Sequence, residues 1–173
     1  MRILVLLICV FALSGCFKTD LRAVKLVRLY DGDSFLVEDY PCLDCEEFQV
    51  RLLGIDAPEA RQQVWGKKSR DRLYSLINKD KVIYLEYDID KLDKYKRHLA
   101  YAYADAQGEE LINLKMLESG HAEVFAFAKD LKYLNEFKNA EIIAKKEHRG
   151  IWSLEGGLEI SPYKYRKNHR RKS

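Results

Sequence analysis

Five short segments of this chain have the residue pattern of β-strands. They are rich in β-branched and aromatic residues or alternate apolar with polar side chains, and they cover residues 23–29, 34–38, 47–55, 81–88 and 98–104. The sequence Asp31-Gly32-Asp33 between the first two is a hairpin signal, because glycine accepts the positive φ that a tight reversal needs. The N-terminal third is therefore predicted to be an antiparallel meander.

Helical patterns separate and follow these strands. They cover about residues 60–78, 110–119 and 129–147, and the last has an apolar stripe that is typical of a core-facing helix: Tyr133, Phe137, Ala140 and Ala144. One helix between the third and fourth strands and two after the fifth predict an α+β fold. Its centre is a five-stranded OB-fold barrel, a mainly β structure covered by about three helices. Fold alone does not establish function.

Length and composition favour one globular domain. The chain has 173 residues, of which 47% are hydrophobic and 33% charged, and its formal net charge is only +3. Overall charge therefore gives no ground for predicting a polyanion ligand. Residues 154–173 are different, because their C-terminal part carries a dense run of Lys and Arg. This basic segment is interpreted as a solvated, mobile tail, or as a source of salt-sensitive attraction to nucleic acid or anionic lipid.

The N-terminus has the features of an export signal. Arg2 precedes an apolar run at residues 3–13, which is shorter than the roughly 20 residues of a spanning helix. Residues 13–16, Leu-Ser-Gly-Cys, resemble the lipobox of bacterial lipoproteins. That resemblance implies a signal peptide at 1–15, a lipidated Cys16, a linker at 16–22 and attachment to a bacterial membrane outside the cytoplasm. An uncleaved anchor and a plain signal peptide are the alternatives.

Two further cysteines, Cys42 and Cys45, form a C-x-x-C pair. No second cysteine pair or nearby histidine pair completes four ligands, so a structural zinc site is disfavoured. An oxidising compartment favours a small loop disulfide between the two. A redox role is weaker, because no strand-to-helix context surrounds the pair.

Phosphodiester cleavage needs phosphate charge to be neutralised, a positioned water and a group that takes its proton. The chain has a candidate for each part: Asp33 and Asp56 for a metal, Arg51 and Arg97 for the phosphate, and Glu59 as the base.

Each candidate also has an ordinary structural explanation. Arg51 would suit the solvent face of a strand, and Asp56 with Glu59 would suit the start of a helix. Arg97 would pair with Asp93 on a surface loop. The Asp-Gly-Asp hairpin lacks the later acidic ligand of an EF-hand. The four histidines are scattered along the chain, which argues against a histidine nuclease or a zinc hydrolase.

Several motifs in combination resemble the staphylococcal-nuclease, or thermonuclease, family. They are residues 31–34, 51–59, 93–101 and 151–152, and they occur in the family's order between residues 24 and 152. The resemblance implies that Asp33, Asp56 and the main-chain carbonyl of Ala57 bind Ca²⁺. It also implies that Glu59 acts as general base, and that the bidentate guanidinium groups of Arg51 and Arg97 grip the scissile phosphate.

The resemblance also implies substrate contacts. Lys94 and Tyr95 would contact a terminal phosphate, although a mobile charged loop is the alternative. Phe125 and Phe127 would stack on bases, unless they belong to the core. Lys96 stands where relatives often have glycine, which would alter the loop that presents Arg97.

The predicted activity is therefore Ca²⁺-dependent endonucleolytic and exonucleolytic hydrolysis of DNA and RNA, with little sequence preference and 3′-phosphate products. The enzyme is expected to be a monomer whose catalytic domain spans residues 23–153. A non-catalytic module that binds nucleic acid or protein on the same barrel, and a lipoprotein with a structural or envelope role, are the alternatives.

Overall fold

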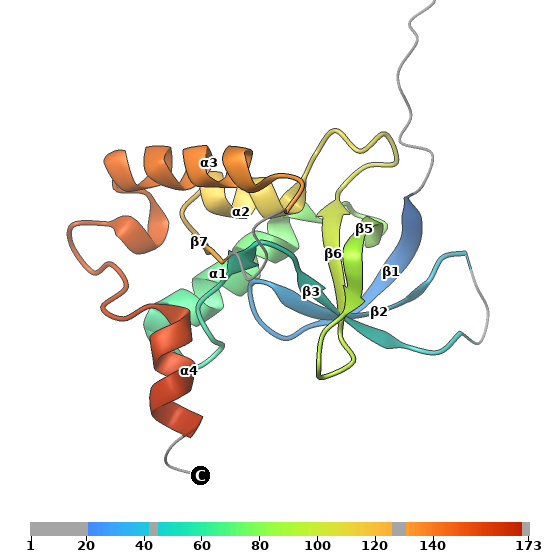
Figure 1. The fold of residues 1–173 in the computed structure, drawn as a ribbon, viewed down its shortest axis with the longest axis horizontal. Helices are drawn as coiled ribbons and strands as arrows, with labels where there is room; N and C mark the ends of the chain where they lie inside the picture. The colour runs from blue at the N-terminus through green and yellow to red at the C-terminus, as the bar shows by residue number, and fades with distance from the viewer. Residues whose placement is uncertain (1–20, 42–44, 126–130, 171–173) are drawn as a thin grey trace, which may run out of the picture.

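The computed structural model describes residues 21–41, 45–125 and 131–170, and its centre is a closed five-stranded barrel (Figure 1). Neighbouring strands around the barrel are β1 (Arg22–Leu29), β2 (Ser34–Asp39), β3 (Phe48–Leu52), β6 (His98–Tyr103) and β5 (Val82–Leu92). All pairs are antiparallel except β3 with β6, which is parallel. The predicted α+β class with a five-stranded barrel is confirmed.

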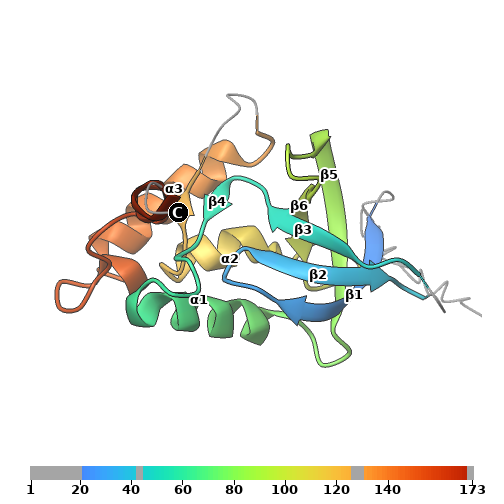
Figure 2. The ribbon, with the colours of Figure 1, turned by 90° about the horizontal axis from the view of Figure 1, so that it is seen from below.

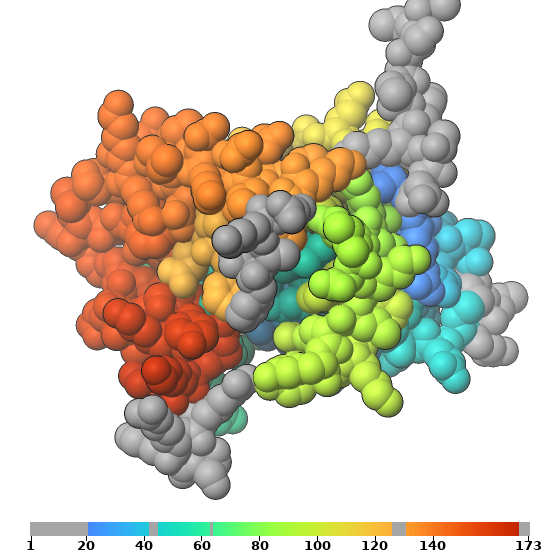
Figure 3. All heavy atoms as spheres, in the orientation of Figure 1, coloured from blue at the N-terminus to red at the C-terminus, as the bar shows by residue number. Residues whose placement is uncertain are grey.

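The described residues form four α-helices and a small second sheet. The helices are α1 (Gln63–Leu76), α2 (Ile112–Glu118), α3 (Leu134–Lys146) and α4 (Pro162–Arg170), with a 3₁₀ turn η1 (Gly150–Trp152) between the last two. The small sheet pairs β4 (Ile55–Asp56) with β7 (Glu123–Val124). The helices gather on one side of the barrel, with β4 and β7 between them and the barrel strands (Figures 1 and 2). The space-filling view shows the same division, with the helical half beside the barrel half (Figure 3).

The core lies inside the barrel and continues beneath α2 and α3. Inward-facing residues of alternating strand positions, such as Val24, Val37 and Val50, are fully buried. The stripe predicted for the last helix is also confirmed as core, because Phe137, Ala140 and Ala144 are buried and Tyr133 packs against them.

A turn at Leu53 and Gly54 interrupts the strand that was predicted to run to residue 55. The chain leaves β3 at Leu52 and re-enters extended structure as β4, paired with β7. Gly54 has a φ of +76°, and a Cβ there would lie 2.6 Å from Cε2 of Phe137. The turn therefore needs glycine both for backbone conformation and for close packing. It carries Asp56 away from the barrel wall and into the space beneath the helices.

The basic C-terminal segment is folded between residues 162 and 170, which corrects the expectation of a solvated, mobile tail there. Helix α4 follows a stretch that is fixed to the start of α1. The Nε2 of Gln62 donates to the Ile160 carbonyl at 2.6 Å, and the Nε1 of Trp65 donates to the Gly156 carbonyl at 2.9 Å. The α4 sequence, PYKYRKNHR, contains no apolar stripe, so its docking could not be predicted from hydrophobic periodicity.

Several predictions fall on residues outside the described ranges. They concern the signal peptide, Cys16, Cys42 and Phe127. Cys45 is disulfide-bonded, and its pairing with Cys42 stays a prediction. Among the described residues, no helix combines the length and apolar character required to cross a membrane.

Replacing Gly54 with alanine should destabilise the fold by about 3 kcal/mol, which combines the strain of a positive φ with displacement of the Phe137 ring. Gly156→Ala is a matched control, because Gly156 has a φ of +67° but has nothing within 4 Å of the place that a Cβ would take. Gly156→Ala should lower the free energy of unfolding by about 1 kcal/mol. Thermal or urea unfolding measures this free energy for both variants, and equal decreases would show that packing of Gly54 against Phe137 is unimportant.

Candidate active site

The hairpin between β1 and β2 brings Asp33 to the exit of β3. Asp33 is 3% exposed, and its Oδ2 accepts a hydrogen bond of 2.6 Å from the backbone N–H of Ala57. Its Oδ1 accepts one of 2.8 Å from the Ser34 hydroxyl. A Cβ on Gly32 would lie 2.7 Å from the Cβ of Ser69 and 2.8 Å from that of Ala57. Glycine therefore lets the hairpin approach α1 and the 56–57 turn closely.

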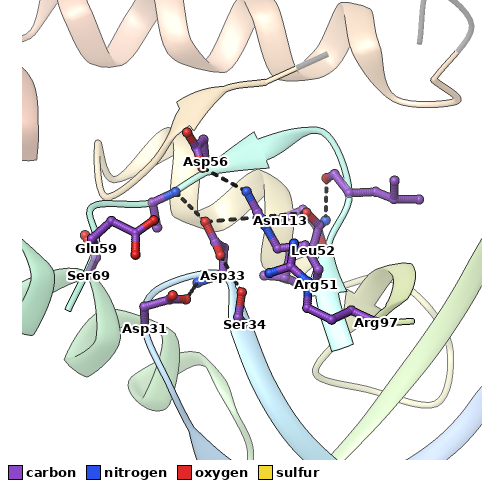
Figure 4. Close-up of polar contacts among 12 residues, drawn as sticks. Asp31, Asp33, Ser34, Arg51, Leu52, Asp56, Glu59, Ser69, Arg97 and Asn113 are labelled. Atoms are coloured by element: carbon purple, nitrogen blue, oxygen red, sulfur yellow. Dashed lines mark hydrogen bonds and ion pairs between the residues drawn. The ribbon is translucent and has the colours of Figure 1, made fainter. Parts of the chain in front are cut away.

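Arg51 points inward from β3 and bridges the two predicted metal carboxylates (Figure 4). Its Nη1 lies 3.0 Å from Oδ2 of Asp33, and its Nη2 donates to Oδ1 of Asp56 at 2.8 Å. Nη1 also donates to the Leu52 carbonyl at 3.0 Å. Arg51 is only 9% exposed, so it does not occupy the solvent face of the strand. A buried, bidentate guanidinium fixes the spacing of the two carboxylates.

Asp56 and Glu59 do not cap a helix. Helix α1 begins at Gln63, its N-cap residue is Gln62, and no side chain caps it. The side-chain oxygen of Gln62 instead accepts a bond of 3.2 Å from the Glu59 N–H, which holds the loop before the helix. Asp56 is fully buried, and the Glu59 carboxylate extends toward Asp33 in the close-up (Figure 4). The helix-capping alternative is therefore excluded for both acids.

Excess negative charge is a property of this site. Burial raises the pKa of Asp56, and repulsion from Asp33 acts in the same direction, while Arg166 and Arg51 oppose it. Burial, with repulsion from Asp33, raises the pKa of Asp31 to about 8. Burial and the nearby charge of Asp56 raise the pKa of Glu123 to about 7. Close carboxylates whose pKa values rise in this way are stabilised by an added cation.

The donor set suits a hard cation such as Ca²⁺, which binds oxygen ligands. Two carboxylates, Asp33 and Asp56, converge on Arg51, and Asp33 also accepts from the Ala57 backbone N–H. Within the described ranges, no three acidic, histidine or cysteine side chains form a ready metal cluster. A cation held here would accordingly take the remaining oxygens from the main chain, water or substrate.

Arg97 lies beside the site and is paired with Asp93. Its Nε and Nη2 are each 2.8 Å from Oδ2 of Asp93. This is the surface pairing that the sequence left open as an alternative. Arg97 immediately precedes β6, whose Leu99 pairs with Arg51, so its backbone borders the strand that carries Arg51. The close-up shows Arg97 next to Arg51, outside the carboxylate pair (Figure 4).

The loop that carries Arg97 is organised by Asp93. Its Oδ1 accepts hydrogen bonds from the N–H groups of Tyr95 at 2.8 Å and Arg97 at 3.0 Å. Lys96 has a φ of +63°, the left-handed conformation for which glycine is favoured. The Nζ of Lys94 lies 5.1 Å from the centroid of the Tyr95 ring, and that ring is largely exposed. Lys94 and Tyr95 are thus together at the surface, and their predicted phosphate contact stays a prediction.

Phe125 lies at the edge of the site, half-buried, and not in the core. Its N–H donates to the Gly54 carbonyl at 2.9 Å, which fixes it next to the turn before Asp56. Its ring centroid is 6.2 Å from that of Tyr163 in the C-terminal helix. An aromatic ring beside a phosphate-binding site suits base stacking, which stays a prediction for Phe125.

Comparisons with known proteins agree with this geometry. The family model described as "Staphylococcal nuclease homologue" matches residues 49–154. This chain belongs to the staphylococcal nuclease family. It is 31% identical over 148 residues to a thermonuclease from Staphylococcus hyicus, and the match covers 83% of each protein.

Two Bacillus subtilis (strain 168) proteins are also similar to this chain. The SPbeta prophage-derived endonuclease YokF is 36% identical over 144 residues, which are 79% of this chain and 46% of the relative. Endonuclease YncB is 33% identical over 140 residues, which are 77% of this chain and 63% of the relative. The predicted family membership is confirmed.

Sequence reasoning missed one positively charged side chain at the site, Arg166 of α4. Its Nη1 donates to Oδ1 of Asp56 at 2.9 Å and to Oε1 of Glu59 at 2.8 Å, and its Nη2 donates to Oδ2 of Asp56 at 2.7 Å. Arg166 lies outside the matched region 49–154. The only sequence signal was the basic character of the tail, which does not distinguish one arginine from its neighbours.

Three other site residues were also missed: Asp31, Asn113 and Glu123. Asn113 is fully buried, accepts from the Ala102 N–H at 2.9 Å and donates to the Leu53 carbonyl at 2.8 Å, so it joins α2 to the turn. Glu123 is opposite Asp56 in the β4–β7 pair. That pairing of two very short strands has no periodic signal in the sequence, so it could not be predicted.

Glu123 should make folding stability depend on pH in chelator. Its folded-state pKa of about 7 lies above its ordinary value of 4.5, so the folded state binds the proton more tightly. Its contribution is therefore fully present below pH 4.5 and is lost as pH rises through 7. Glu123→Gln should be about 1 kcal/mol more stable relative to wild type at pH 8 than at pH 4, after solvent screening is allowed for.

Urea unfolding in chelator at both pH values measures this difference. Glu155 is exposed, so Glu155→Gln is the control, and its stability relative to wild type should be the same at both pH values. An equal change in the two variants would contradict the assignment.

Proposed function

We propose that this chain is a Ca²⁺-dependent nuclease that hydrolyses phosphodiester bonds of DNA and RNA with little sequence preference. The observation that carries the proposal is the buried Arg51 bridge between Asp33 and Asp56, with the Glu59 carboxylate nearby and linked to Asp56 through Arg166. Family membership and relatives named thermonuclease and endonuclease support hydrolysis of nucleic acid.

In this proposal Asp33, Asp56 and the carbonyl of Ala57 hold the cation. Bound there, Ca²⁺ supplies positive charge to neutralise a phosphate oxygen. The protein holds the two carboxylates ready through Arg51 and through the N–H of Ala57, so little rearrangement of these groups is needed. The buried surroundings of Asp56 strengthen its attraction for a cation.

Glu59 is proposed to be the general base. Its carboxylate takes a proton from a water, the water oxygen forms a bond to phosphorus, and the bond from phosphorus to the 5′ oxygen breaks. The leaving oxygen receives a proton from solvent, and the phosphate remains on the 3′ side. Arg51 and Arg97 donate N–H groups to the phosphate as its negative charge develops, and Arg97 exchanges part of its pairing with Asp93 to do so.

A nuclease assay in Ca²⁺ and in chelator tests the proposal on single-stranded and duplex DNA. Cleavage should require Ca²⁺, and Glu59→Gln should lower kcat by about 10² to 10⁴, the usual contribution of a general base. The exposed Glu155→Gln is the matched control with unchanged kcat. Undiminished cleavage in chelator or in Glu59→Gln would refute the mechanism. Binding of DNA without cleavage would identify a non-catalytic module instead.

We also propose that the enzyme is a lipoprotein that acts outside the cytoplasm. The apolar run at residues 3–13 and the Leu-Ser-Gly-Cys sequence at 13–16 support this location. Residues 23–153 are then a monomeric catalytic domain joined to the lipid by the linker at 16–22. In a bacterial host, Cys16→Ser should move the protein from the membrane fraction to the soluble fraction, because stable anchoring requires the lipid. Unchanged membrane association would contradict lipidation at Cys16.

A further inference from the structure

Helix α4 contacts the proposed cation site and the proposed base-stacking residue at the same time. The Arg166 guanidinium makes three hydrogen bonds of 2.7 to 2.9 Å to the carboxylates of Asp56 and Glu59. One helical turn earlier, the Tyr163 ring lies 6.2 Å from Phe125, centroid to centroid. The Arg166 guanidinium carbon also lies 6.0 Å from the centre of the Phe125 ring. A single short helix thus contacts both the proposed cation site and Phe125.

Arg166 takes the oxygens that a cation would need. Oδ2 of Asp56 accepts from Arg166, and Oδ1 is shared between Arg166 and Arg51. The same Nη1 that reaches Asp56 also engages Glu59, the proposed base. Arg51 bonds Oδ1 of Asp56, whereas Arg166 also bonds Oδ2, the oxygen that the Arg51 bridge does not use. Arg166 and Ca²⁺ therefore compete for Oδ2 of Asp56.

Besides Arg166, the described residues attach α4 and the segment before it through a small set of polar contacts. Its preceding segment is fixed through Gln62 and Trp65, and the Tyr165 hydroxyl donates to the Arg61 carbonyl at 3.2 Å. The helix has nine residues, too few to be stable alone in water. Its docking includes the buried Pro162, the Arg166 contacts and the pairing of Tyr163 with Phe125. These Arg166 and Tyr163 contacts go to β4, Glu59 and Phe125, which lie outside the barrel strands, so the barrel pairing does not depend on them.

We propose that α4 is an intramolecular inhibitor that occupies the site through Arg166 and is displaced when Ca²⁺ binds. This inference rests on the proposed function, because it takes Asp56 as a cation ligand. Part of the binding energy of Ca²⁺ is used to release the helix, so the helix lowers the apparent affinity for Ca²⁺. Released α4 exposes Phe125 to nucleic acid, so access for the metal and for the substrate opens in one step.

Ca²⁺ titration calorimetry on the full chain in detergent micelles tests the proposal. Arg166→Gln should bind Ca²⁺ about 5- to 150-fold more tightly than wild type, the usual range for two coupled sites. Lys167→Gln is the matched control, because it removes the same charge from an exposed position of the same helix and should leave the Kd unchanged. Arg166→Lys keeps the positive charge but cannot form bidentate hydrogen bonds, so it should increase the affinity for Ca²⁺ less than Arg166→Gln does.

Hydrogen exchange of the α4 amides gives a second readout that does not depend on activity. In wild type, Ca²⁺ should accelerate exchange over residues 162–170 while the barrel amides stay protected. In Arg166→Gln, exchange there should already be fast in chelator.

The outcomes separate this inference from the proposed function. Equal Kd values in wild type and Arg166→Gln, or weaker binding in Arg166→Gln, would overturn the inhibitor while leaving a Ca²⁺ site in place. Unchanged protection of α4 on addition of Ca²⁺ would do the same. If neither protein bound Ca²⁺, the proposed metal dependence would fall, and the competition with it.

Discussion

The arrangement of the site depends on one buried cation, Arg51. It is the only group described above that contacts both Asp33 and Asp56, and it joins three pieces of chain: the hairpin, the third barrel strand and the turn beyond it. Because a buried charge without partners is costly, each of these pieces is constrained by the others. Arg51 therefore holds Asp33 of the hairpin and Asp56 of β4 in a fixed relation to the third barrel strand.

The barrel and much of the site were predictable because their signals are local. The strands show in short apolar or alternating runs, and the Asp-Gly-Asp hairpin shows in its turn residues. Asp56 and Glu59 were proposed for the site because phosphodiester cleavage needs acidic side chains and because residues 51–59 resemble a family motif, and their roles stay predictions. The contacts of Arg51 with Asp33 and Asp56 were not predicted, because the sequence indicated Arg51 only as a phosphate ligand or a solvent-facing strand residue.

Other parts were not predictable because they depend on tertiary contacts between distant segments. The β4–β7 pair has two residues on each side, too few for a periodic pattern. Helix α4 has few apolar residues, so hydrophobic periodicity gave no signal for its docking. Arg97 shows a different limit, because an arginine can pair with a carboxylate or with a phosphate; the structure shows its pairing with Asp93, and its predicted contact with a phosphate stays a prediction.

The order of these contacts along the chain has a consequence for biosynthesis. Arg51 is five residues from Asp56, whereas Arg166 is 110 residues away. At ribosomal rates, about 5 to 20 seconds separate the synthesis of Asp56 from that of Arg166. During that interval, of the two arginines that contact Asp56 in the folded protein, the nascent chain contains Arg51 and not yet Arg166.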